Sequence, residues 1–284
     1  MKKGTTITIV FLMCFSVFAQ QKAVEEIYAK YFQAIGSENS KNVANVQAKL
    51  ITTSENTAEI RSNILGDSKN NVETNSKIIS FTDYVGKYYA SISYSITSFG
   101  NVLSRTLQSN GKGYFVMEDG TKTEYPVTVD IFKNGYASET IPPGSERMPD
   151  EVFKEEEVYV VKCELEKTLP TIKKNTQYTY FSKSSGLIIG SKQITSILIE
   201  NPTVGNTAVN STTINDFKDY KEIGGILVAH RIDTTIESET NGPNMKNTSL
   251  TNSTQIYTDI QFNTDMESFK SNCFQKPKEC IAAF

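Results

Sequence analysis

The chain has 284 residues and a formal net charge of −3, with 38% hydrophobic residues, 21% charged residues and no Trp. This balance excludes collagen-like, low-complexity and charge-disordered chains. It also argues against nucleic-acid binding, because binding to phosphates requires a basic face. The single His in the whole chain argues against His-rich metal sites and most His-based triads. The composition favours a soluble binding protein.

The first residues have the pattern of a secretory signal peptide. Lys2 and Lys3 form a basic start, an apolar run extends from residue 7 to residue 18, and Ala19 offers a small residue for cleavage. The run is shorter than the roughly 20 apolar residues that a bilayer-spanning helix needs. We therefore expect a signal peptide at 1–19, cleaved near Ala19, and a periplasmic or secreted protein whose residues 20–284 form a single domain with a C-terminal tail.

The cysteines do not indicate a lipid anchor or a metal site. Cys14 follows the bulky Met13, whereas the cysteine that receives a lipid anchor is expected after a small residue. Cys273 and Cys280 lie close together in the C-terminal tail, and in an exported protein they favour a disulfide. Zinc is disfavoured because no further ligands stand nearby. Cys163 lies in an apolar strand pattern and is expected to be a small buried residue.

One amphipathic helix is expected at the start of the mature chain. Apolar residues with helical spacing share one of its faces: Val24, Ile27, Tyr28, Tyr31, Phe32 and Ile35. Gly36 follows, the residue type that most readily adopts a left-handed C-terminal cap. Since the rest of the chain has the pattern of a sheet, the helix is expected to bury its apolar face against strands.

Alternation of apolar and polar residues dominates the later sequence and predicts β-strands. The clearest run places one set of apolar residues on one side: Tyr88, Ala90, Ile92, Tyr94 and Ile96. The other side of this run, from Tyr89 to Thr97, is almost entirely hydroxylated. Similar alternation occurs at residues 159–165, 226–237 and 256–262. Such strands have two different faces, of which the apolar one is expected to be buried.

Turn signals separate the strand-like runs and predict hairpins. They are Asn110-Gly111, Asp119-Gly120, Asn134-Gly135, Ser184-Ser185-Gly186 and Gly224-Gly225. About ten strands follow from this pattern, near the limit for an open sheet without strong curling. The predicted fold class is therefore mainly β with an α lid: a curved antiparallel sheet that forms an incomplete barrel, covered by the N-terminal amphipathic helix.

Three segments depart from the alternation. After the prolines between residues 142 and 149, the acidic segment 150–157 is expected to form a short helix. The Asn- and Thr-rich stretches 201–210 and 241–252 are expected to be long loops.

Several segments in chain order resemble one family. They are YFQAIG at 31–36, VYVV at 158–161, YTYF at 178–181, SGLI at 185–188, FKDYKEIGGI at 217–226, HRI at 230–232 and IQFN at 260–263, followed by Phe269. Together with the signal peptide, this order is similar to that of outer-membrane lipoprotein-sorting proteins, the LolA/LolB-like class, in particular its Bacteroidetes-type exported relatives.

The resemblance covers most of the mature chain through diffuse strand and turn motifs. It implies an incomplete antiparallel barrel, with helices closing an apolar cavity that receives acyl chains. Ser37 stands where such relatives often have a second Gly. The missing lipid-attachment motif disfavours a membrane-anchored acceptor.

Signals for catalysis are weak, and we expect neither an enzyme nor a cofactor. The chain lacks metalloprotease, nucleophile-elbow and phosphate-loop motifs. His230 lies between Val228 and Ile232 on an apolar strand face, which favours a packing role. The acidic run 155–157 favours a solvated surface, since consecutive carboxylates do not converge on one ion.

The leading hypothesis is a non-enzymatic carrier for lipoprotein acyl chains or another hydrophobic ligand. An outer-membrane or periplasmic protein is a further expected partner, and nucleic acid is not. The alternative is an exported interaction or assembly module without a ligand cavity. The cavity lining is expected from one face of the helix and one face of the clearest strand: Ile27, Tyr31, Phe32, Ile35, Tyr88, Ile92, Tyr94 and Ile96.

Overall fold

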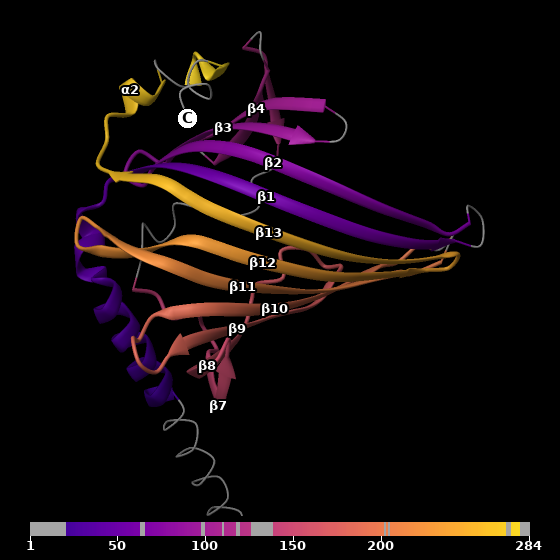
Figure 1. The fold of residues 1–284 in the computed structure, drawn as a ribbon, viewed down its shortest axis with the longest axis horizontal. Coiled ribbons are helices and arrows are strands. Elements are labelled where there is room, and N and C mark those ends of the chain that lie inside the picture. The colour runs from indigo at the N-terminus through magenta and orange to yellow at the C-terminus, as the bar shows by residue number, and fades with distance from the viewer. Residues whose placement is uncertain are drawn as a thin grey trace, which may run out of the picture.

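The protein is a single curved antiparallel sheet with a helix packed on one face, as a computed structural model shows (Figure 1). The structure describes residues 21–62, 66–97, 100–109, 111–117, 120–125, 139–201, 203, 205–270 and 274–278. Its 13 strands have the spatial order β6-β5-β4-β3-β2-β1-β13-β12-β11-β10-β9-β8-β7. The sheet is not closed on itself, and this confirms the predicted mainly-β fold with an α lid.

The strands are β1 (Asn45–Ser62), β2 (Ser68–Asp83), β3 (Tyr88–Thr97), β4 (Gly100–Ser109), β5 (Lys112–Val116), β6 (Lys122–Tyr125), β7 (Glu146–Phe153), β8 (Glu156–Glu164), β9 (Ile172–Ser182), β10 (Ile188–Ile199), β11 (Thr207–Ile223), β12 (Ile226–Gly242) and β13 (Met245–Phe262). The described helical segments are the N-terminal helix at 21–35, the 3-10 helix η1 (Ser37–Asn42) and the short α2 (Met266–Phe269).

The first and last strands meet at the centre of the sheet. β1 pairs with β13 along almost its whole length, from Val46 opposite Phe262 to Ser62 opposite Met245. From this seam, consecutive hairpins extend outward to β6 on one side and to β7 on the other. The strands near the seam are the longest, and in Figure 1 their far ends extend well beyond the helix.

Irregular positions interrupt the ladders and help the sheet to bend. The β1–β13 register shifts between Lys49 and Leu50, and further shifts occur in the β9–β10 and β7–β8 pairs. The extra residue at such a shift increases local twist and bends a strand. Asp219 in β11 adopts a left-handed φ of 53°, and its pairing with His230 is missing from the β11–β12 ladder without any shift of register.

The N-terminal helix packs against β8 and β9. We call the face of the sheet that it covers the helix face. Val24, Ile27 and Tyr28 are buried there against Val161 and Phe181. This confirms the predicted amphipathic helix and its apolar face. The helix is followed by Gly36 in a left-handed conformation, with φ 66°, as expected for its C-terminal cap.

A second hydrophobic core lies on the opposite face of the sheet, beneath α2. Phe269 of α2 stacks on Phe81 of β2 with ring centroids 5.3 Å apart. Ile79, Ala90 and Ile92 complete the buried part of this cluster. The sheet therefore has a core on each face: the one under the N-terminal helix uses β8 and β9, and the one beneath α2 uses β2 to β5.

Three expectations from the sequence are wrong. Residues 150–157 do not form a helix but the β7–β8 hairpin, in which Lys154 and Glu155 both adopt positive φ. Residues 207–210 begin β11, and 241–252 belong to the β12–β13 hairpin. The sheet also has more strands than the ten expected. The far parts of β11, β12 and β13 contact water on both faces, so the apolar alternation that identifies a half-buried strand is missing there. In the β7–β8 hairpin, exposed acidic residues dominate the sequence although Phe153 packs on Tyr180.

Some expectations fall outside the described residues. These are the signal peptide at 1–19 with its cleavage near Ala19, the Asn134-Gly135 turn, and the Cys273–Cys280 disulfide. The division into a leader and one domain at 20–284 stays a prediction. Within the described ranges, no helix combines the length and the hydropathy that crossing a bilayer requires.

Candidate functional site

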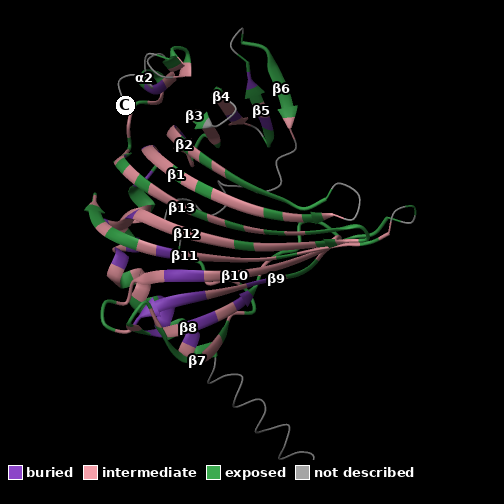
Figure 2. Cartoon of the chain, turned by 45° about the vertical axis from the view of Figure 1, so that its right-hand side comes forward, coloured by how far each residue is buried: buried purple, intermediate pink, exposed green. Residues whose placement is uncertain are grey.

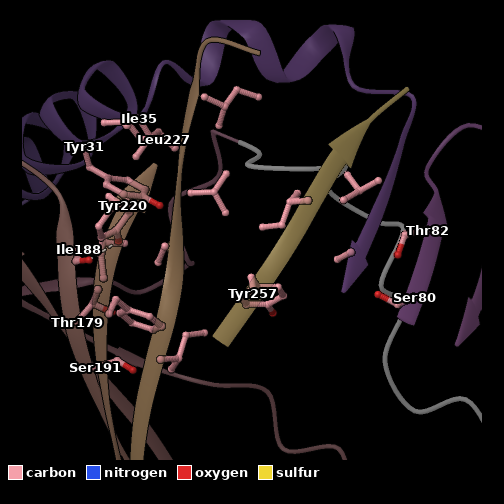
Figure 3. A pocket seen from close by; sticks show the side chains of 18 of the residues that line it. Tyr31, Ile35, Ser80, Thr82, Thr179, Ile188, Ser191, Tyr220, Leu227 and Tyr257 are labelled. Carbon is pink, nitrogen blue, oxygen red and sulfur yellow. Dashed lines mark hydrogen bonds between the residues drawn. The ribbon is translucent and has the colours of Figure 1, made fainter. Parts of the chain in front are cut away.

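A cavity of about 540 Å³ lies between the N-terminal helix and the helix face of the sheet (Figure 3). Side chains from β1, β2 and β9–β13 surround it together with the helix. Its lining is Tyr28, Tyr31, Ile35, Val46, Ala48, Ser80, Thr82, Tyr84, Gln177, Thr179, Ile188, Ser191, Phe217, Tyr220, Ile226, Leu227, Val228, Ala229, Ile232, Tyr257 and Ile260. Cavities of this size and largely apolar lining are typical of small-molecule sites.

The helix supplies the roof of the cavity through Tyr28, Tyr31 and Ile35. Edge-to-face contacts hold the two tyrosines in place, with ring centroids 5.0 Å from Phe181 for Tyr28 and 5.8 Å for Tyr31. Because Phe181 belongs to β9, these contacts join the roof to the sheet. The cavity lies beside these packed rings.

The floor comes from the seam where the first and last strands meet. Val46 and Ala48 of β1 lie beside Ile260 of β13, and Ile226 at the start of β12 joins the same buried cluster. The half-buried Tyr257 lines the cavity next to them. Because Ala48 has a short side chain, it occupies little of the space between the sheet and the helix.

The cavity has several tyrosines but no charged lining residue within the described part of the chain. Burial raises the pKa of Tyr28, Tyr31, Tyr220 and Tyr257, so all four hydroxyls stay neutral at physiological pH. The Tyr220 hydroxyl donates a hydrogen bond to the carbonyl of Ile188. The interior is therefore apolar and uncharged, which suits hydrocarbon chains.

Polar lining residues lie on two sides of the cavity. Ser80 and Thr82 of β2 lie beside the floor, opposite Ala48 and Val46. Gln177, Thr179 and Ser191 lie where the cavity continues along β9 and β10, away from the helix. The Gln177 side-chain amide donates to the Thr179 hydroxyl at 3.2 Å. The lining thus changes from apolar under the helix to neutral hydroxyl and amide groups beyond it.

The predicted helical residues lie at the cavity or next to it. Tyr31 and Ile35 line the cavity, as Figure 3 shows. Ile27 and Phe32 instead pack in the adjoining cluster with Phe181. Direct contact of any of the four with a ligand stays a prediction.

The predicted strand residues are placed elsewhere, and this corrects their assignment to the cavity lining. Ile92 is fully buried on the opposite face with Phe81, and Tyr88 and Tyr94 pack against that same cluster. Ile96 is 50% exposed. The hydroxylated side of β3, not its apolar side, shares the helix face with Ser80 and Thr82, because Ser91 pairs with Ser80 and Tyr89 with Thr82.

The floor residues escaped the sequence reading for a related reason. Val46 and Ala48 stand in a stretch with weak alternation, and Ile226, Val228 and Tyr257 belong to strands whose cavity side is fixed only by pairing with β1 and β13. The alternation of apolar and polar residues does not by itself distinguish a residue that lines a cavity from an ordinary core residue.

Residues with potential for catalysis or metal binding play structural roles. His230 is buried, and its Nδ1 lies 3.0 Å from the carbonyl oxygen of Val228. Cys163 is buried, as expected, and burial raises the pKa of its thiol, so it is a poor nucleophile. No group of three or more His, Cys, Asp or Glu in the described ranges could hold a metal ion.

Two further hollows are lined mainly by residues of the opposite face, the smaller near the middle of the long strands and the larger toward their far ends. Their volumes are about 290 and 770 Å³. Hydroxyl, amide and acidic groups dominate their lining, including Glu55 and Glu73 in the smaller hollow and Glu237 and Glu239 in the larger. No described helix covers them, and acidic residues distinguish both from the cavity under the N-terminal helix, whose lining in the described part of the chain is uncharged.

No family model and no curated protein matches the chain. Solved structures similar to it include an outer membrane lipoprotein-sorting protein domain from Vibrio parahaemolyticus, with 11% identity, a TM-score of 0.41, and coverage of 87% of this chain and 99% of that one. A LolA superfamily protein from Nitrosomonas europaea has 9% identity, a TM-score of 0.35, and coverage of 83% and 96%. LprF from Mycobacterium bovis has 8% identity, a TM-score of 0.25, and coverage of 87% and 97%. The first two have the family name that the sequence resemblance suggests.

Proposed function

We propose that the protein is an exported, non-enzymatic carrier that holds the acyl chains of a lipidated protein, or another hydrophobic ligand, between its N-terminal helix and its sheet. The uncharged cavity of about 540 Å³ under the helix is the observation on which this rests. The signal-peptide pattern of residues 1–19 supports export to the periplasm or beyond.

Burial of hydrocarbon alone can supply the binding free energy of such a site, without specific polar contacts. Each methylene group that leaves water for an apolar interior contributes about 0.8 kcal/mol, so a medium-length acyl chain supplies ample affinity. Tyr31 and Ile35 on the helix, and Ala48 on the floor, would contact the chain from two sides. Loading and release would require the helix to move away from Phe181.

The alternative, an interaction module without a ligand cavity, would require a filled interface between the helix and the sheet. Such an interface would bring the helix down onto Ala48 and Ile260, both of which line open space. The cavity therefore favours the carrier.

Native mass spectrometry tests this proposal. The protein is expressed with its own leader in a bacterial periplasm and purified, and its lipids are then extracted and identified. The expected result is a population of molecules with the added mass of one or more acylated compounds. The proposal fails if the folded protein retains no such compound and binds none when amphiphiles are supplied.

A pair of neighbouring substitutions sharpens the test. Ala48→Phe places a ring in the cavity, whereas Gln47→Phe places the same ring on the opposite face of β1. We expect Ala48→Phe to reduce retained acyl compound by at least half, and Gln47→Phe to leave it unchanged. Equal retention by two folded variants would contradict a ligand site under the helix.

A further inference from the structure

Charged side chains are segregated between the two faces of the long strands. The pairing registers assign every second residue of β1, β2, β3 and β13 to the helix face, and likewise Ser191–Ile199 of β10, Thr207–Phe217 of β11 and Ile232–Gly242 of β12. Within the described residues of these segments, the helix face has no Asp, Glu, Lys or Arg.

The opposite face of the same strands contains the charges. On β1 they are Lys49, Glu55, Glu59 and Arg61, which are an even number of residues apart and therefore share this face. Several are paired across strands, as in Lys69 with Glu59 at 3.1 Å. Since both faces are largely in contact with water at the far end of the sheet (Figure 2), solvation alone does not explain why only one of them is neutral.

A continuous row of hydroxyl and amide side chains crosses the helix face at the end of the cavity. The residues lie opposite one another on six successive strands, and we call them the hydroxyl row: Ser54, Ser253, Thr234, Asn215, Ser191 and Thr179. Ser191 and Thr179 also line the cavity. The row therefore begins where the apolar lining ends.

Hydrogen bonds fix part of the hydroxyl row. Thr234 donates to the Asn215 side-chain oxygen at 2.8 Å, and the Asn215 amide donates to the Ser191 hydroxyl at 3.1 Å. Further along the strands the same chemistry continues, for example where Gln193 donates to Asn175 at 2.8 Å. The result is a half-buried surface that presents both donors and acceptors without formal charge.

We propose that the hydroxyl row receives the uncharged, hydroxyl-bearing headgroup of the amphiphile whose chain occupies the cavity. This inference rests on the proposed carrier function and specifies the ligand class: acyl glycerols, glycosylated lipids or similar compounds whose heads have alcohols and no phosphate or carboxylate. A chain that enters under the helix and extends along the strands brings its head to Ser191 and Thr179.

The physical basis is the cost of placing an ion on this surface. An alcohol headgroup exchanges hydrogen bonds with Ser, Thr and Asn side chains, which can both donate and accept. A phosphate in the same position would lose part of its hydration without gaining a cationic partner, and partial burial of an unpaired charge is unfavourable. Recognition of an anionic head would require Lys or Arg, which the described helix face of these segments lacks.

Two amphiphiles with the same chain test the proposal: 1-lauroylglycerol and 1-lauroylglycerol 3-phosphate. Their affinities are measured by displacement of 1-N-phenylnaphthylamine from the purified full-length protein, below the concentrations at which either compound aggregates. We expect the glycerol ester to bind about tenfold more tightly. Equal or tighter binding of the phosphate overturns the headgroup inference while carriage stands, whereas failure of both compounds to bind overturns carriage and this inference together.

Adjacent substitutions on β12 localise the effect. Thr234→Lys adds a cation to the hydroxyl row beside Asn215, two strands from Ser191, and Thr235→Lys adds the same charge to the opposite face, where Thr235 lines the smaller hollow with Glu55 and Glu73. We expect Thr234→Lys to shift the preference toward the phosphate by at least fivefold, and Thr235→Lys to shift it by less than twofold. Equal shifts in the two variants would show that only net charge matters, and would overturn the assignment of the headgroup to this row.

Discussion

Gly36 and Gly225 approach so closely that a Cβ on Gly36 would lie 2.1 Å from the carbonyl oxygen of Gly225. The contact joins the end of the N-terminal helix to the turn between β11 and β12. Asn39 strengthens it by donating its side-chain amide to the same carbonyl at 3.0 Å. The roof of the cavity is thus fastened at one end to the strands that form part of its floor.

Gly36→Ala is expected to destabilise the protein by about 2–4 kcal/mol, because alanine is strained at φ 66° and its methyl group meets the Gly225 carbonyl. Urea unfolding followed by circular dichroism measures the change. Gly111→Ala is the control, since Gly111 has a similar φ of 74° but open space around it, and about 1 kcal/mol is expected there. Equal losses in the two variants would contradict a specific role for the close approach.

Phe181→Ala should release the helix from the sheet. Its ring is buried against Tyr28, Tyr31 and Val161, so its removal is expected to cost about 3–5 kcal/mol through lost contacts and a new void. Limited proteolysis should then cleave within residues 21–35 before it cleaves the strands. Phe115→Ala, at a ring that is 48% exposed, serves as control and is expected to lose about 1 kcal/mol or less. Protection of the helix in Phe181→Ala would argue against this anchor.

The sequence predicted the two-sided strand at β3 correctly but assigned its sides to the wrong neighbours. Alternation shows that Tyr88 and Ile92 share a face, and that Ser91 lies on the other. It does not show which face the N-terminal helix covers, because that depends on the pairing of Ser91 with Ser80 in β2. The apolar side of β3 is instead buried in the second core, on the opposite face, which Phe269 from the C-terminal part of the chain completes.

Local patterns also limited the prediction of the longest strands. Hairpins such as β12–β13 are recognised by apolar alternation near Ile226 and Ile260, where one face is buried. At their far ends both faces are wet, and Thr, Ser and Asn occupy both sides, so composition there is the same as in a loop. Central β1–β13 pairing joins residues about two hundred positions apart, and no local signal encodes it.

Asp233 is expected to make the stability of the sheet pH-dependent. Burial opposes ionisation of its carboxyl group, but hydrogen bonds from Arg231, Lys218 and Thr254 outweigh burial and lower its pKa to about 2. Since this pKa is below the unfolded value of about 3.9, the contribution is fully present above about pH 4 and is lost as the pH falls toward 2. Solvent screening in this partly exposed cluster limits it to about 1 kcal/mol.

The measurement compares urea unfolding of wild type and Asp233→Asn at pH 6 and pH 2. The variant should be less stable by about 1 kcal/mol at pH 6, and the difference should nearly vanish at pH 2. Asp259→Asn is the control, because the ion pair of Asp259 with Lys49 is long, at 3.8 Å, and the Asn side chain can still accept the hydrogen bond from Gln261, so the substitution should have little effect at either pH. A loss that is the same at both pH values would rule out titration of Asp233 as the cause.

Substitutions at Ile35 and Ile92 test whether a side chain contacts the ligand or only packs in a core. Ile35 is buried in the helix and lines the cavity, whereas Ile92 is fully buried on the other face of the sheet. Ile35→Ala removes methylene contacts from a bound chain and should weaken binding of 1-lauroylglycerol about five- to tenfold. Ile92→Val should cost about 1 kcal/mol of stability and leave the dissociation constant unchanged. Probe displacement and urea unfolding on the same preparations measure both quantities, and weaker binding by a folded Ile92→Val would place the ligand on the opposite face.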